Sequence, residues 1–227
     1  MTGYGLKHAT AGTARMLAAS KLVEAFGHVS ARLPGGGFLI TSTKPTLEAT
    51  ADSVVTVDAD GTVVEDPSGA APLEIPMHAG IYRSRPDVAA ICRGHGPAMV
   101  AWGVAAEDVP LLHGLGAIAG AVVPVHPDLN LITTQESGDR LALTLGHHHC
   151  ALLLSNGGLA VGADLLEAAT RLWFLEERAK VALAARRTEP AAGNWDQRMT
   201  YTDVELIRAK AWFKARFGPA DPIFDPE

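Results

Sequence analysis

Apolar residues recur along the chain at two spacings, and each spacing predicts a different kind of element. Recurrence every three to four residues, often with alanine between, is typical of amphipathic helices. Such segments lie at residues 8–26, 74–84, 98–102, 135–145, 163–185 and 202–217. Gly27 follows the first segment at a place where glycine commonly ends a helix, so we expect that helix to stop there.

Shorter runs rich in β-branched residues predict strands. They lie at residues 29–33, 38–41, 54–57, 62–64, 88–92, 150–154 and 159–161. Pro34-Gly35-Gly36-Gly37 and Asp58-Ala59-Asp60-Gly61 supply the turns of two hairpins. Hairpin-linked strands interleaved with helices favour a mixed or antiparallel sheet flanked by helices, and no boundary separates two cores.

The composition agrees with one folded core. The 227 residues are 48% hydrophobic and 19% charged, which excludes a disordered chain. A linker rich in proline and glycine follows the helix at 163–185. We therefore divide the chain into a main domain, 1–190, and a C-terminal linker with its helix, 191–227, packing on the same domain or on a neighbouring subunit.

Charge and cysteine content exclude several classes of protein. The net charge is −6, and no basic run is longer than Arg186-Arg187, which argues against a nucleic-acid surface. No apolar stretch reaches 18 residues, and the N-terminus lacks the pattern of a signal peptide, so we expect no membrane partner. Cys92 and Cys150 lie in apolar runs and are expected to be free thiols in the cytoplasm.

Three segments contain residues that could act in catalysis. Glu74 begins a predicted helix, where a carboxylate either caps the helix or serves as a general base beside a cleft. Arg93 and His95 follow a buried strand with glycine on both sides of His95, and are either structural or part of a site. Adjacent histidines on a strand point to opposite faces, so His147-His148-His149 is expected to be a solvated turn rather than a metal site.

In order along the chain, these segments resemble the class II aldolase and adducin head-domain family over about residues 10–185. The most specific similarity combines Glu74, His78, Ile81-Tyr82 and Arg85-Pro86-Asp87-Val88. The other similar segments are Gly27-His28-Val29-Ser30, Phe38–Thr41, Asp52–Gly61 and Leu152–Gly162. The resemblance implies a three-layer α/β/α domain with a central, mainly antiparallel sheet, and a homo-oligomer, usually a tetramer, with sites between subunits.

The differences from the family concern its metal site. Active members bind a divalent metal through three histidines, and the corresponding residues here are Arg93, His95 and Gly157. One imidazole is fewer than the three protein ligands usual in a catalytic site. We therefore expect no cofactor, with the Arg93 guanidinium replacing the metal as a cation. If zinc, manganese or iron does bind, His95 is the expected ligand.

The expected substrate is a small oxo- or hydroxy-acid. The serines that bind phosphate in sugar-phosphate aldolases are absent, and His28 resembles the branch that includes decarboxylases of aromatic acids. Glu74 is expected to be the acid and base, Arg93 the clamp for an anion, and His95 a positioning group. The residues expected to bind the substrate are His28, Ser30, Thr41, Lys44, His113, Asn156 and Gly157.

Three accounts of the function are therefore open. The first is a metal-independent lyase that performs C–C cleavage, decarboxylation or related enolate chemistry. The second is a metal-dependent aldolase or decarboxylase whose other ligands, such as His113, His126 or one of residues 147–149, come from elsewhere. The third is a non-catalytic assembly module. The apolar, glycine-rich stretch Leu111–Val125 is expected at a subunit contact, with His113 near a neighbour's site.

Overall fold

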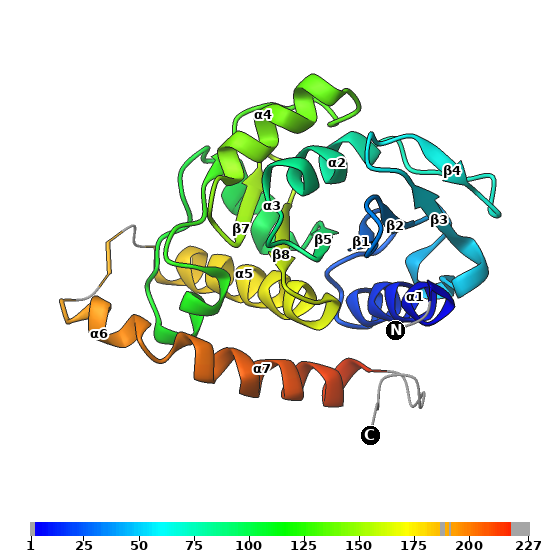
Figure 1. Cartoon of the computed structure of the whole chain (residues 1–227). Helices are drawn as coiled ribbons and strands as arrows, with labels where there is room; N and C mark the ends of the chain where they lie inside the picture. The colour runs from blue at the N-terminus through cyan, green and yellow to red at the C-terminus, as the bar shows by residue number, and fades with distance from the viewer. Residues whose placement is uncertain (1–2, 187–188, 191, 219–227) are drawn as a thin grey trace.

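An eight-stranded sheet forms the centre of the protein (Figure 1). The computed structural model describes residues 3–186, 189–190 and 192–218. The strands are β1 (His28–Arg32), β2 (Phe38–Thr41), β3 (Val54–Val57), β4 (Val63–Glu65), β5 (Ala90–Gly94), β6 (Val125–His126), β7 (Cys150–Leu153) and β8 (Gly158–Gly162).

The strand order places two distant segments side by side at the centre of the sheet. The order is β4-β3-β2-β1-β5-β8-β7-β6, and every neighbouring pair is antiparallel except β6 and β7, which are parallel. The expected mainly antiparallel sheet is confirmed. In the β1–β5 pair, His28 lies directly opposite Arg93, so both side chains point to the same face.

Helices cover both faces of this sheet. The α-helices are α1 (Gly3–Ala19), α2 (Ile75–Ser84), α3 (Pro97–Gly103), α4 (Gln135–Leu145), α5 (Leu165–Ala185), α6 (Trp195–Met199) and α7 (Thr202–Phe217). Short 3-10 helices are η1 (Thr46–Glu48), η2 (Ala51–Ser53) and η3 (Gly114–Ala119). In Figure 1, α1 and α5 lie below the sheet and α2 and α4 above it, which is the three-layer arrangement expected.

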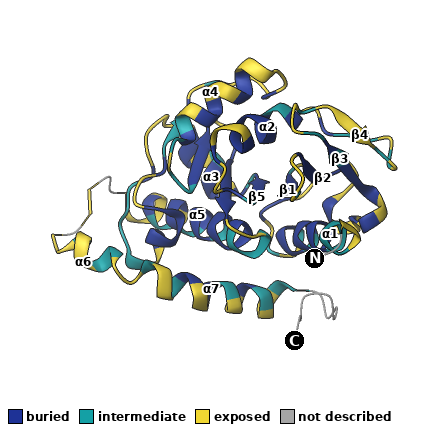
Figure 2. Ribbon diagram, viewed as in Figure 1, coloured by how far each residue is buried: buried dark blue, intermediate teal, exposed yellow. Residues whose placement is uncertain are grey.

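The alternation of residues along each strand divides the core in two. On β5, Cys92 packs with α1 and α5, whereas Ile91 packs with α2 and α4. Figure 2 shows the sheet buried between helices whose outer faces are exposed. Each fully buried aliphatic side chain contributes about 1.5–3 kcal/mol to folding. Both layers are therefore well supported, and the sheet is a rigid base for side chains at its edges.

Two glycines let α2 and α4 pack closely. A Cβ atom on Gly80 of α2 would lie 2.6 Å from the carbonyl oxygen of Gly138 on α4, closer than real Cβ contacts. A Cβ atom on Gly138 would in turn collide with the Pro76 carbonyl oxygen. This contact fixes α2 against the sheet, and α2 follows directly after Glu74.

The first helix ends earlier than the sequence predicts. It stops at Ala19, and the backbone N–H groups of Lys21 and Leu22 bond the carbonyls of Ala18 and Leu17 in a Schellman motif. Lys21 takes the left-handed conformation there, with φ of 61°, a position where glycine is usual. The expected stop at Gly27 is therefore wrong, and residues 20–26 instead lead from α1 to β1.

The apolar stretch Leu111–Val125 packs in part within its own chain, although Leu115 and Val122 are 47% and 40% exposed. Ile118 is fully buried, and its carbonyl oxygen accepts a hydrogen bond of 2.8 Å from Arg171 on α5. The Gly120 carbonyl likewise accepts one of 2.6 Å from Arg178. The subunit contact expected for this stretch stays a prediction.

The C-terminal helix lies along the main domain of the same chain. Helix α7 contacts α5, η3 and α1, and Phe213 on α7 is fully buried. The remainder of the predicted unit 191–227, residues 191 and 219–227, lies outside the described residues. Among the described residues, no helix combines the length and the apolarity needed to cross a membrane.

Candidate active site

A cavity of about 460 Å³ lies where β1 and β5 face the start of α2. Its polar lining includes His28, Lys44, Glu74, His95 and Asn156. These five residues come from segments far apart in the sequence, and the sequence predicts all five as site residues.

Glu74 takes the N-cap position of α2 but does not cap the helix. Its side chain makes no capping hydrogen bond. Its Oε2 lies 3.2 Å from Nε2 of His28, and its Oε1 accepts a hydrogen bond of 3.3 Å from the backbone N–H of Ile132. The capping interpretation is therefore wrong, and the carboxylate faces the cavity with both oxygens held.

The surroundings keep Glu74 ionised. Burial alone would raise the pKa of this carboxyl group, because it disfavours the charged form. The hydrogen bond from His28, the charge of Arg93 and the Ile132 N–H together outweigh burial, so the pKa lies below its usual value. At neutral pH the group is a carboxylate and can accept a proton.

His95 is held as a neutral imidazole. Burial and the neighbouring charge of Arg93 lower its pKa to about 4. Its Nδ1 atom is buried and has no hydrogen-bond partner among the described residues, and its ring makes an edge contact with Phe26, 6.5 Å between centroids. A neutral ring with an unsatisfied nitrogen beside a cavity is suited to hydrogen-bond a ligand.

Arg93 is fully buried and does not line the cavity. Its Nη2 donates a hydrogen bond of 2.6 Å to the Asn156 carbonyl, and its Nη1 donates to the carbonyls of Gly94 and Gly158. Burial lowers its pKa to about 10, so it remains charged at neutral pH. The expected direct clamp on an anion is not supported by this geometry, and Arg93 acts on the cavity through its charge.

Gly157 leaves no room for a side chain. Its φ is +76°, and a Cβ atom there would collide with the Gly94 carbonyl oxygen and lie 2.9 Å from Cα of His95 and 3.2 Å from Nη1 of Arg93. The backbone of Gly94 and His95, together with the Arg93 guanidinium, therefore occupies the space beside Gly157, so a histidine at this position would collide with its neighbours.

The donors present do not fit the metal site of the family. Arg93 stays protonated and cannot coordinate a metal, and Gly157 contributes no side chain. Among the described residues, no group of three or more His, Cys, Asp or Glu side chains is placed to hold a metal ion. Of the three positions at which the family has metal-binding histidines, only position 95 has a histidine in this chain.

Four predicted binding residues do not line the cavity, and Gly157, described above, is one of them. The Ser30 hydroxyl bonds His78 and Tyr82 behind the cavity wall, and the Thr41 hydroxyl accepts from the backbone N–H of Val29. His113 lies at the start of η3, outside this cavity. Direct contact of these side chains with a ligand in the cavity of the same chain is not supported.

Sequence reasoning gave no role to His78 and Tyr82. They follow Glu74 at intervals of four residues, the spacing that places side chains on one helix face. This spacing is the sequence signal that connects them with Glu74. Both side chains connect to Glu74 through buried hydrogen bonds.

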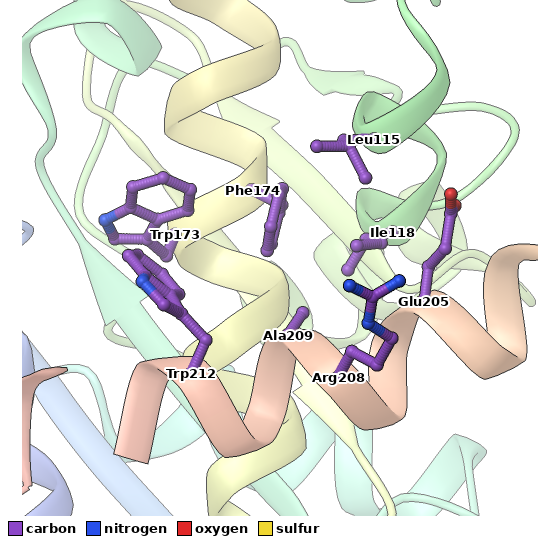
Figure 3. A pocket seen from close by; sticks show the side chains of 8 residues that line it. All are labelled: Leu115, Ile118, Trp173, Phe174, Glu205, Arg208, Ala209 and Trp212. Carbon is purple, nitrogen blue, oxygen red and sulfur yellow. The ribbon is translucent and has the colours of Figure 1, made fainter. Parts of the chain in front are cut away.

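A second cavity, of about 440 Å³, lies between α5, η3 and α7 (Figure 3). Leu115, Ile118, Trp173, Phe174, Ala209 and Trp212 form its apolar lining, with Glu205 and Arg208 beside them. Glu205 forms an ion pair of 2.8 Å with Arg198. The lining contains no histidine or cysteine, and we therefore assign the candidate chemistry to the cavity at Glu74.

Comparisons with curated proteins identify decarboxylases and aldolases as relatives. A 3,4-dihydroxyphthalate decarboxylase of Terrabacter sp. (strain DBF63) is 29% identical over 195 residues, 80% of this chain and 82% of the relative. Another, of Rhodococcus jostii (strain RHA1), is 28% identical over 118 residues, 50% of this chain and 49% of that protein. An L-fuculose phosphate aldolase of Escherichia coli (strain K12) is 29% identical over 154 residues, 66% of this chain and 68% of the relative.

Solved structures share the fold. An L-fuculose 1-phosphate aldolase has a TM-score of 0.76 at 25% identity, covering 94% of this chain and 97% of the other. The Escherichia coli protein YgbL, described as a putative aldolase/epimerase/decarboxylase, has a TM-score of 0.77 at 19% identity, covering 89% and 99%. Aldolases and decarboxylases are both lyases, so this distant homology suggests a lyase.

The model of the Class II Aldolase and Adducin N-terminal domain matches residues 8–183, which include every strand of the sheet and the whole cavity lining. The chain belongs to this family.

Proposed function

We propose that the protein is a lyase for a small oxo- or hydroxy-acid, with Glu74 as its general base and no requirement for a divalent metal. One observation carries this proposal. Glu74 is an ionised carboxylate, held at both oxygens, in the wall of a cavity that also contains a neutral His95. A base that is ionised and oriented before the substrate arrives is what proton abstraction requires.

The ionisation of Glu74 favours a reaction that starts with loss of a proton. In an aldol-type cleavage of a hydroxy-acid, the carboxylate accepts the hydroxyl proton and the O–H electron pair forms a carbonyl. The adjacent C–C bond breaks, and its electron pair remains on the other fragment as a carbanion or enolate. Glu74 then returns its proton to that carbon, which restores the carboxylate and balances the reaction.

Charge and shape of the cavity support an acid as the substrate. Lys44 is exposed at the cavity and makes no hydrogen bond or ion pair with any residue that the structure describes, so its ammonium group can meet a carboxylate. The buried guanidinium of Arg93 adds a second positive charge behind the wall. Phe26 and Leu73 also line the cavity, although they are 75% and 72% exposed, and offer an apolar surface to the carbon skeleton of the substrate.

A substrate screen tests this function. The purified full-length protein is incubated with hydroxy-acids, oxo-acids and hydroxyaryl acids, in the presence and absence of a chelator, and aldehyde, ketone and carbon dioxide release are measured. We expect catalytic turnover of at least one acid, unchanged by the chelator. Turnover that depends on added metal would support the metal-dependent alternative, and no turnover of any acid would favour an assembly module.

A homo-tetramer, which the family resemblance implies, stays a prediction.

A further inference from the structure

A continuous chain of buried hydrogen bonds leads away from Glu74 into the core. Oε2 of Glu74 lies 3.2 Å from Nε2 of His28, and Nδ1 of His28 lies 2.8 Å from Nε2 of His78. Nδ1 of His78 lies 2.7 Å from the Ser30 hydroxyl, which lies 2.8 Å from the Tyr82 hydroxyl. All five side chains are buried, with Glu74 and His28 at the cavity end.

The fold aligns these groups by matching two spacings. His28 and Ser30 are two residues apart on β1, a rise of about 6.6 Å along the strand. Glu74, His78 and Tyr82 are four residues apart at and within α2, a rise of about 6 Å per interval. The strand and the helix therefore present polar side chains at almost equal intervals. Along the hydrogen-bond chain, residues of β1 alternate with residues at the start of α2 and within it.

The far end of the chain sets the direction of every hydrogen bond. The Tyr82 hydroxyl is buried, and Ser30 is its hydrogen-bond partner among the described residues. If Tyr82 accepted this bond, its own hydrogen would be left without an acceptor, which is costly in a core. Tyr82 therefore donates to Ser30, and Ser30 in turn donates to Nδ1 of His78.

The same requirement fixes the direction of the two hydrogen bonds that lie closer to the cavity. With Nδ1 of His78 accepting, the His78 proton is on Nε2, which donates to Nδ1 of His28. His28 then carries its proton on Nε2 and donates to Glu74. In this arrangement each of the four hydrogen bonds has one donor and one acceptor, and all of them point toward the carboxylate.

We propose that His78, Ser30 and Tyr82 are positioning residues that hold His28 as a permanent Nε2–H donor to Glu74. The inference deepens the proposed function, on which it rests, by stating how the base is oriented. Because Oε2 always accepts from His28, the proton that Glu74 takes up is carried on Oε1. Phe38 stacks on the His78 ring, 6.2 Å between centroids, and restricts its rotation.

Other charged and titratable groups lie beside this chain of hydrogen bonds and affect its protonation. Arg93 on β5 lies opposite His28. Burial lowers the pKa of His78 well below the usual value, and the charge of Arg93 lowers it further. His95 and Lys44 share the cavity with Glu74. Arg32 lies over the Tyr82 ring, 4.6 Å from its centroid.

Nitrogen NMR of the full-length protein, labelled with ¹⁵N-histidine, tests the direction of the chain without a substrate. Its chemical shifts distinguish a ring nitrogen that carries a proton from one that does not. At neutral pH we expect His28 and His78 both to be neutral with the proton on Nε2, their signals being assigned from single variants of each. A proton on Nδ1 of His78, or a doubly protonated His28, would overturn the proposal.

Two variants of one residue test its effect on the base. In His78→Gln, a planar amide keeps one donor for His28 and one acceptor for Ser30, whereas His78→Phe keeps the ring volume and removes both. We expect His78→Phe to lower kcat about 10-fold with KM little changed, and His78→Gln to stay within about 3-fold of the wild type. The acid limb of the kcat/KM profile should move to higher pH in His78→Phe, because Glu74 loses its oriented donor.

The control is a histidine outside this chain of hydrogen bonds. His8 on α1 is half-buried and packs edge-on against Tyr4, 4.7 Å between ring centroids, so His8→Gln is expected to leave kcat and the pH profile unchanged. Equal kcat for His78→Phe and the wild type would contradict the positioning role. The NMR result does not depend on turnover, so failure of the proposed lyase activity is distinguished from failure of the hydrogen-bond direction.

Discussion

Glu74→Gln is expected to lower turnover of an acid found in the substrate screen by about 100-fold or more, the effect of removing a general base. Glutamine keeps the shape of the side chain, and its amide oxygen still accepts the hydrogen bond from His28. The amide cannot accept a proton from the substrate at neutral pH. The loss is therefore expected in kcat, with substrate binding largely retained.

The control for this variant is a carboxylate away from the cavity. Glu48 on η1 is exposed, and Glu48→Gln is expected to leave turnover unchanged. Circular dichroism and thermal unfolding of both variants show whether the fold is kept. A Glu74→Gln protein that is folded and as active as the wild type would remove Glu74 from the mechanism.

Arg93→Met is expected to lower the free energy of unfolding by roughly 3 kcal/mol or more, because it leaves buried carbonyl groups without donors. The guanidinium donates to the carbonyls of Gly94, Asn156 and Gly158, and methionine donates to none of them. Denaturant unfolding measures the change. The expected loss is larger than that of most surface substitutions, because all three carbonyl contacts are lost together.

Arg83→Met is the matched control. Arg83 lies on α2 and pairs with Asp139 at 2.6 Å, with its side chain about one third exposed. A surface ion pair of this kind contributes about 0–1 kcal/mol, so we expect a small change in unfolding. If Arg93→Met instead unfolds like the wild type and loses substrate affinity, Arg93 contacts the substrate, as the sequence predicts, and the structural role is wrong.

The sequence predicts a helix well where the spacing of apolar residues and the end signals lie within the segment itself. Strong periodicity and clear end signals predict α4 at 135–145 and α7 at 202–217, the bounds that the structure shows. The end of α1 depends on Lys21 in a left-handed conformation, which has no glycine to signal it. Strand β6 has two residues and pairs with β7 in parallel, too short for a pattern to appear.

The candidate site shows the same limit. Glu74 and His95 could be predicted because each stands next to an element end, and the cavity contains both. The position of the Arg93 side chain could not be predicted, because its guanidinium bonds the turn at residues 156–158. Asn156 in this turn is 63 residues from Arg93 along the chain, and the sheet brings the two together. The interval of four residues after Glu74 indicates that His78 lies on the same side of α2 as Glu74. Its hydrogen-bond partners His28 and Ser30, both on β1, are seen only in the structure.

Calorimetric titration of the chelator-treated full-length protein with Zn²⁺ or Mn²⁺ alone tests the central claim most directly, namely that a buried guanidinium has replaced the metal of the family. A catalytic metal site usually has three protein ligands, and His95 is one. The His95→Ala variant is titrated in parallel, so that metal held by other histidines cancels in the comparison. We expect the two proteins to titrate alike. One tightly bound metal per chain in the wild type, absent from His95→Ala, would contradict the account.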